Sequence, residues 1–234
     1  MTVGVLLTGD TGTGKTTAAL NLAVKYVQAK KEQPKIDAPI ITFVDANMGG
    51  EFILGRICKD HPNLKPWVRR VVPTDCDHLT SILGKPSEEN TDSVYLSPVV
   101  VIDGISDYVD FAAEHADGAA REGTGLGSKD DVRLDAMFRL QRLTNTAMRR
   151  GNTELFIGTQ QNVWGAKGQY LRGMAHMKFY FDMIARTNLY KPKGGRKHTI
   201  TLDKIRGADN PVSLPNGVDD LVRIIRDLPT LEKE

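Results

Sequence analysis

One stretch decides the fold of this chain: Gly9-Asp10-Thr11-Gly12-Thr13-Gly14-Lys15-Thr16. It fits the pattern G-x4-G-K-[ST] at every fixed position. Glycines at this spacing let a loop curl so that successive backbone N–H groups point inward at phosphate oxygens. A short apolar segment, residues 3–8, precedes the loop, and apolar residues at helical spacing follow it over residues 15–30. The sequence therefore predicts a strand, a phosphate-binding loop and a helix, in that order.

The chemistry of such a loop predicts a bound nucleoside triphosphate, ATP, together with Mg²⁺. Lys15 is expected to reach the β- and γ-phosphates, and the hydroxyl of Thr16 is expected to bind the metal. The positive end of the following helix dipole adds to the attraction for phosphate. The predicted nucleotide contacts are Gly9, Asp10, Thr11, Gly12, Thr13, Gly14, Lys15, Thr16 and Thr17.

A second feature is the apolar segment at residues 98–103, which ends in Asp103. A carboxylate at the C-terminal end of a buried strand lies where the ligands of an open α/β sheet bind. Asp103 is therefore predicted to share the Mg²⁺ with Thr16. The next residue is Gly104, which departs from motors that place a catalytic Glu directly after this acid.

The remaining chain alternates strand-like and helix-like segments. This alternation predicts one α/β domain over residues 1–234, with a mostly parallel twisted sheet and helices on both faces. Further strands are expected at residues 39–45, 66–72, 154–159, 177–190 and 197–205, and helices at 132–150 and 218–226. Residues 110–129 are expected to form a loop or a frayed helix, and 211–234 a C-terminal helix and tail.

Composition places the protein among soluble globular proteins, since 40% of the residues are apolar and 26% charged. Cys58 and Cys76 match no metal-ligand spacing and are expected to be free thiols in a reducing compartment. We find no signal peptide and no apolar run of membrane-spanning length, so we expect a cytoplasmic protein without a membrane contact.

Charge is unevenly distributed, although the net charge is only +2. Residues 164–206 hold ten Lys or Arg against two Asp, a net +8, which leaves −6 for the rest of the chain. Such a basic window indicates a surface that faces a polyanion. The alternative is a solvated basic face with no partner.

Taken in order over residues 1–210, these motifs resemble the RecA-like recombinases and hexameric helicases. The resemblance implies a RecA-like ATPase core with late antiparallel strands. The catalytic Glu of that family would fall at Asn47 in this chain. Because an amide cannot take a proton from water, Asn47 cannot carry over the catalytic role. Asp45 or Glu51 would have to substitute, or both are ordinary polar residues at a strand end. Hydrolysis is therefore expected to be slow without DNA or a partner.

The same resemblance assigns a γ-phosphate sensor to Gln160, with Gln161 as its neighbour. In RecA-like proteins the loop that follows contacts single-stranded DNA, and here it spans residues 162–173. Aromatic side chains stack on bases for about 1–3 kcal/mol each, and cations meet the phosphates. The alternative is a pair of core aromatics beside solvated cations. The residues in question are Trp164, Lys167, Tyr170 and Arg172.

The last resemblance is Lys204-Ile205-Arg206, on a predicted late strand. In the family such cations reach the γ-phosphate bound by the adjacent subunit and stabilise the charge that develops as it leaves. Lys204 and Arg206 therefore imply a homo-oligomer, as a ring or a filament. The alternative is a basic edge strand that discourages aggregation.

Length and motif order are most similar to the short RecA-like ATPases of bacteriophages. Because the loop begins at residue 9, we expect no N-terminal polymerisation arm. The leading hypothesis is a DNA-stimulated ATPase that binds single-stranded DNA, promotes recombination or annealing and works in the host cytoplasm. A single-strand-binding protein is a further expected partner. The alternatives are a helicase-type or packaging-type motor and an ATP-dependent switch or loader that acts on a protein.

Overall fold

The computed structural model describes residues 2–30, 40–46, 48–88, 90–105, 138, 142, 144–148, 153–165, 168–171, 181–190, 195, 197–205 and 211–231, with backbone alone at 76, 162–165, 168–171 and 229–231. The predicted loop at 110–129 and most of the predicted helix at 132–150 lie outside these ranges. Within them, residues 144–148 are helical, as expected.

The core of the fold is one sheet in the order β3-β2-β4-β5-β1-β7-β8-β9, with β6 paired to β5. Neighbours from β3 through β7 run parallel, whereas the pairs β7–β8, β8–β9 and β5–β6 are antiparallel. This confirms the predicted mostly parallel sheet with late antiparallel strands. The strands are β1 (Val3–Gly9), β2 (Ile41–Asp45), β3 (Val68–Val71), β4 (Val99–Asp103), β5 (Leu155–Gly165), β6 (Gly168–Leu171), β7 (Met183–Tyr190), β8 (Lys197–Ile205) and β9 (Val212–Leu214).

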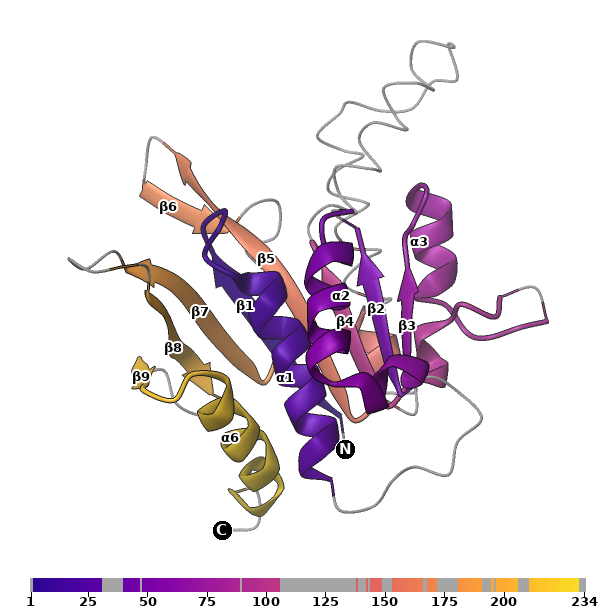
Figure 1. Cartoon of the computed structure of the whole chain (residues 1–234). Coiled ribbons are helices and arrows are strands. Elements are labelled where there is room, and N and C mark those ends of the chain that lie inside the picture. The colour runs from indigo at the N-terminus through magenta and orange to yellow at the C-terminus, as the bar shows by residue number, and fades with distance from the viewer. Residues whose placement is uncertain are drawn as a thin grey trace.

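Helices cover both faces of the sheet, as Figure 1 shows. Side chains alternate between the faces along each strand, so Val5 and Leu7 join one apolar core while Leu6 joins the other. The first core is closed by α1 (Lys15–Ala29), α2 (Glu51–Asp60) and α6 (Val218–Leu231). The second is closed by α3 (Cys76–Ile82) and by residues of the 144–148 helix. We call these the α1 face and the α3 face.

Several predicted boundaries of strands and helices are wrong. The expected strand at 66–72 begins only at Val68, because the short helix η1 (Pro62–Trp67) starts on a proline and occupies the residues before it. The expected strand at 177–190 begins at Met183, one residue after Asp182, whose carboxylate accepts the Gly4 N–H at 2.8 Å. The C-terminal helix continues beyond residue 226 as far as Leu231.

A larger correction concerns the predicted DNA-contact loop at residues 162–173. The strand expected at 154–159 continues to Gly165, and its outer half pairs with β6 in the register Asn162↔Leu171 to Gly165↔Gly168. The backbone N–H and C=O groups there bond across an antiparallel ladder, so the segment is a hairpin. Trp164 and Tyr170 lie on its two strands, whereas Lys167 and Arg172 lie outside the described residues.

Besides η1 and β6, four described elements were not predicted from the sequence: α2, α3, β9 and the short helix η2 (Val94–Leu96). α2 forms because Ile53, Leu54 and Ile57 recur at helical spacing and pack on the α1 face. α3 begins where the side chain of Asp75 accepts the His78 N–H at 2.8 Å and so caps the helix.

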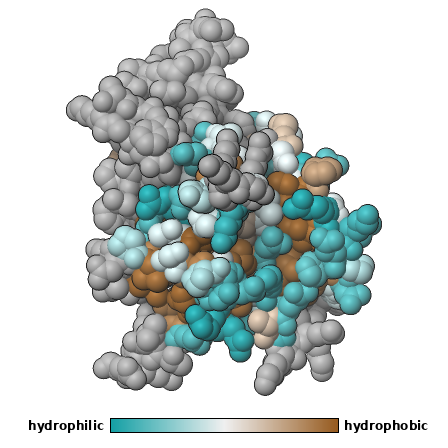
Figure 2. Space-filling model, turned by 60° about the vertical axis from the view of Figure 1, so that its left-hand side comes forward, coloured by the Kyte–Doolittle hydropathy of each residue, from teal (hydrophilic) through white to brown (hydrophobic). Residues whose placement is uncertain are grey.

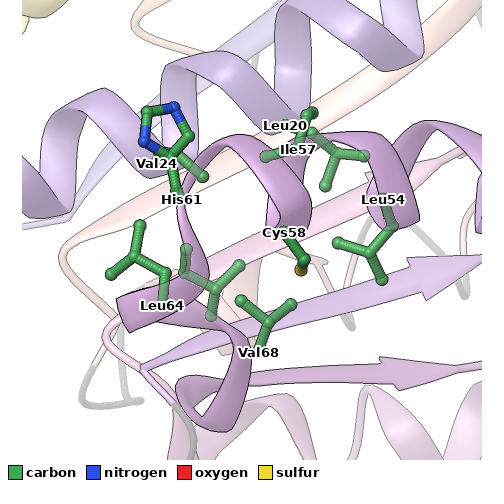
Figure 3. Close-up of a pocket in the computed structure, with 9 residues that line it drawn as sticks. Leu20, Val24, Leu54, Ile57, Cys58, His61, Leu64 and Val68 are labelled. Atoms are coloured by element: carbon green, nitrogen blue, oxygen red, sulfur yellow. The ribbon is translucent and has the colours of Figure 1, made fainter.

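The seam between α1 and α2 is almost fully packed. Side chains from α1, α2, η1 and the first residues of β2 and β3 converge there around a space of about 10 Å³, drawn in Figure 3. This is at most the room that one water needs, so the two helices pack with almost no void between them. Cys58 lines the space as a free thiol, and burial raises the pKa of that thiol.

Figure 2 shows the α6 side of the molecule, where hydrophilic side chains surround separate apolar areas. Among the described residues, no helix is both long and apolar enough to span a membrane.

Candidate active site

The phosphate-binding loop joins the carboxyl end of β1 to the start of α1. Gly9 has a φ of 152°, where a side chain would be strained, and a Cβ there would meet the carbonyl oxygen of Thr187 at 2.6 Å. The loop can therefore turn only with glycine at this position. Lys15 lies over the turn, because its Nζ donates to the carbonyl oxygens of Gly9 at 3.0 Å and Asp10 at 2.9 Å.

Thr16 and Asp103, the predicted Mg²⁺ pair, are in direct contact. The Thr16 hydroxyl donates to Oδ2 of Asp103 at 2.7 Å. From the next strand, the Thr159 hydroxyl donates to Oδ1 at 2.6 Å and accepts the Gly104 N–H at 2.8 Å. Sequence reasoning missed Thr159, because only the order of the strands places β5 between β1 and β4.

Asp103 is a buried acid whose described hydrogen-bond donors are hydroxyls. Its residue is 3% exposed, and burial raises the pKa of its carboxyl. The hydrogen bonds from Thr159 and Thr16 lower this pKa, the charge of Asp45 raises it and the ammonium of Lys15 lowers it. A divalent cation at this carboxylate would offset the desolvation of the charge. Hydroxyl and carboxylate oxygens are also the ligands that Mg²⁺ prefers. The residues present therefore fit the metal.

Asp45 lies beside Asp103, since the two residues pair in the register of β2 and β4. It is 0% exposed, and it accepts the Gly50 N–H at 3.1 Å and the guanidinium of Arg70 at 2.7 Å. Arg70 also donates to Oε2 of Glu51 at 3.3 Å. Of the two acids predicted as substitutes for the catalytic Glu, Asp45 is held in a buried ion pair. Glu51 begins α2 with its side chain 80% exposed. Asn47 lies outside the described residues.

The predicted γ-phosphate sensor and its neighbour lie on opposite faces of the sheet. Gln160 is fully buried, and it follows Gly158 on the α3 face, where a Cβ at Gly158 would meet Phe181 and Ile105. Gln161 lies on the α1 face, and its Nε2 donates to the hydroxyl of Thr11 at 2.5 Å. The structure thus brings Gln161 to the phosphate-binding loop. The role of Gln160 stays a prediction.

Lys204 lies on β8 away from this loop. It pairs with Ile184 of β7, which is level with Leu6 of β1. Leu6 precedes the loop by three residues, or roughly 10 Å of strand. An irregularity in the β7–β8 register beside Asp203 also turns Lys204 to the face of Ile184, and the Arg186 guanidinium holds Asp203 at 2.6 Å. Arg206 lies outside the described residues.

The loop opens on a cleft of about 610 Å³ that the sequence did not predict. One wall is α1 with Ile53 and Arg56 of α2, and the other is the start of β8 with the turn before α6. His198 of β8 lines this cleft and contacts the loop, as does Thr187 of β7. Nothing in the local sequence marks either residue, because β7 and β8 reach the loop only through the sheet.

No protein-family model matches the sequence, and no curated protein matches it either. Among solved structures the chain is similar to a KaiC-like protein from the hyperthermophilic archaeon Pyrococcus horikoshii OT3, with 17% identity, a TM-score of 0.54 and coverage of 93% of this chain and 87% of that chain. It is also similar to the flagellar accessory protein FlaH from Methanocaldococcus jannaschii, with 14% identity, a TM-score of 0.52 and coverage of 90% and 84%.

At these identities the likeness shows the fold alone, and the predicted similarity to phage recombinases stays a prediction. The chain therefore has the RecA-like P-loop fold, with its phosphate-binding loop and Asp103 together at the carboxyl edge of the sheet.

Proposed function

We propose that the protein binds ATP with Mg²⁺ at this loop and hydrolyses it to ADP and phosphate. The observation that carries the proposal is the contact of Thr16 with the buried Asp103, directly below the curled loop and Lys15. Thr16 and Asp103 would hold the metal, which when bound neutralises charge on the β- and γ-phosphates. Lys15 would exchange its carbonyl partners for phosphate oxygens.

We assign the activation of water to Glu51. Its carboxylate is exposed at the start of the helix whose Ile53 and Arg56 line the cleft, whereas Asp45 is occupied by Arg70 and Gly50. Glu51 would take a proton from water as the water oxygen bonds to the γ-phosphorus and the bond to the bridging oxygen of ADP breaks. Arg70 would orient Glu51 through their contact.

We further propose that the site is completed by a second copy of the chain. Lys204 lies about three strand residues from its own loop, which suits a cation that acts on a neighbour's nucleotide. Beside the site, Phe52 is 80% exposed on α2 and Met48 is also exposed. Large apolar side chains on a polar surface favour a protein contact there.

A mixing experiment tests this assembly. Lys15→Ala would remove ATP turnover at its own site, and Lys204→Ala would remove the cation offered to the neighbour. A mixture of the two inactive variants should regain part of the ATPase rate. If no mixing ratio restores turnover, Lys204 either acts at the site of its own subunit or has a purely structural role.

We propose single-stranded DNA as the polyanion bound by the basic window. The hairpin of β5 and β6 begins one residue after Gln161, so a change at the contact between Gln161 and Thr11 would pass directly into it. ATP would then tighten DNA binding and hydrolysis would loosen it, as recombination or annealing requires. The test measures single-stranded DNA affinity with and without a non-hydrolysable ATP analogue. Equal affinities would contradict the coupling.

Two alternatives give different results in the same assays. A helicase-type or packaging-type motor would separate strands or move along DNA in an ATP-dependent manner. An ATP-dependent switch would show no DNA affinity and would bind a protein through the exposed Phe52 and Met48.

A further inference from the structure

His198 is placed against the phosphate-binding loop by the sheet. β7 runs parallel to β1 and β8 returns antiparallel to it, so the first residues of β8 arrive beside the carboxyl end of β1. There Nδ1 of His198 lies 2.8 Å from the carbonyl oxygen of Thr13. A carbonyl oxygen can only accept a hydrogen bond, so Nδ1 carries the hydrogen and donates it.

This bond fixes the direction of a peptide group inside the loop. A trans peptide is planar, and its C=O and N–H groups point to opposite sides. Because the Thr13 carbonyl points toward His198 on β8, the N–H of Gly14 points away from β8. Backbone N–H groups of a curled loop bind phosphate oxygens in this way.

The side-chain hydroxyl of Thr13 is also held in place. The Thr13 hydroxyl donates to the Asp10 carbonyl at 2.8 Å and accepts the hydrogen of the Thr187 hydroxyl at 2.8 Å. Thr13 is therefore fixed by both of the strands that follow β1 in the sheet.

Gly14 shows how closely the ring approaches. Its φ is 87°, and a Cβ at this position would lie 3.1 Å from Nδ1 of His198. A side chain at Gly14 would push the ring away from the Thr13 carbonyl, in addition to straining the backbone. The loop and the histidine thus fit each other at the start of α1.

We propose that His198 is a positioning residue for the triphosphate: through its hydrogen bond to Thr13 it aims the Gly14 N–H at a phosphate. The inference rests on the proposed ATP site and deepens it. It also gives β8 a contact at each end, His198 at its own subunit's loop and Lys204 toward the neighbour's nucleotide.

Three variants test the role. His198→Ala removes the donor. His198→Asn restores it, since the amide nitrogen of Asn and Nδ1 of His are both bonded to Cγ. Val212→Ala is the matched control, because Val212 is 51% exposed on β9, the strand next to β8, and lies outside the basic window. For each we would measure the Kd of a fluorescent ATP analogue, its displacement by inorganic tripolyphosphate, and the urea midpoint.

We expect His198→Ala to weaken both ATP and tripolyphosphate by about fivefold, as for one lost hydrogen bond. His198→Asn should return both to within about twofold of wild type, and Val212→Ala should change neither. Unchanged affinities in His198→Ala would overturn the inference. So would a loss for ATP without a loss for tripolyphosphate, since the ring would then contact the nucleoside, or a loss that Asn does not restore.

The underlying proposal is tested separately with Lys15→Ala. If this variant binds ATP as tightly as wild type, the proposed ATP site itself is wrong, whatever the histidine variants show. If Lys15→Ala abolishes binding and His198→Ala does not weaken it, only the positioning role is wrong.

Discussion

Two buried acids, Asp45 and Asp103, end neighbouring strands in register and face the same side of the sheet, yet their surroundings differ. Asp45 accepts from a guanidinium and a backbone N–H, whereas the described donors to Asp103 are two hydroxyls. A buried carboxylate with a cationic partner is already compensated, and it belongs to the frame of the site. A buried carboxylate that accepts only from hydroxyls, with no cationic hydrogen-bond partner, can bind a metal ion that compensates its charge.

The largest expected effect comes from exchanging Asp103→Asn. ATP turnover should fall on the order of a thousandfold, because metal-assisted charge stabilisation is worth several kcal/mol. The matched exchange Asp45→Asn should leave the Mg²⁺ concentration for half-maximal rate unchanged. Steady-state ATPase assays over a Mg²⁺ series measure both. A shift in Mg²⁺ dependence for Asp45→Asn alone would reverse the two roles.

The next effect is on stability, and the two acids should respond with opposite signs. Arg70→Met leaves Asp45 buried without its partner. We expect a loss of about 3 kcal/mol, the lower end for a broken buried pair, since the Arg70 side chain is 25% exposed. Adding Asp45→Asn to Arg70→Met should recover most of the loss.

These free energies of unfolding are measured by urea denaturation without Mg²⁺ and nucleotide. In the same measurement, Asp103→Asn should be as stable as wild type or more stable. Its buried charge, whose pKa is raised by desolvation, is then absent. A loss for Asp103→Asn as large as that for Arg70→Met would show that the two acids are equivalent.

A third substitution, Glu51→Gln, tests whether Glu51 activates water while the neighbouring pair of Asp45 and Arg70 has a structural role. The turnover number should fall about a hundredfold, as for a lost general base, with the Kd for ATP unchanged. Lys59→Gln, at an exposed position of the same helix, serves as the control. Single-turnover hydrolysis and ATP binding are measured in parallel. A full rate in Glu51→Gln would exclude Glu51 as the base and leave Asp45 in that role.

The smallest effect is expected on the Asp103 side, at Gln161. Gln161→Ala removes the bond to Thr11 and should reduce the ATP-dependent gain in single-stranded DNA affinity by about fivefold. Gln160→Met, which keeps the buried volume, should retain the gain. Fluorescence anisotropy with labelled DNA and a non-hydrolysable analogue measures the difference. The opposite ranking would restore Gln160 as the sensor.

The boundaries that the sequence missed depend on features that the apolar pattern does not reveal. Pro62 and Asp182 alter where a strand begins through a short helix and a side-chain bond, which the apolar pattern does not reveal. The pairing of residues 162–165 with 168–171 was predicted as a loop, because both segments contain glycine and their pairing is set across the ladder rather than by a local pattern.

Sequence by itself determined the phosphate-binding loop, the helix behind it and the acid at the end of a buried strand. In the loop, curling glycines and Lys15 are neighbours along the chain, so their spacing suffices to specify the turn. Tertiary structure alone decided which acid is paired with Arg70, which glutamine faces the loop, and that His198 contacts Thr13 across 185 residues. These choices depend on the order and register of strands, which long-range packing selects and no local pattern encodes.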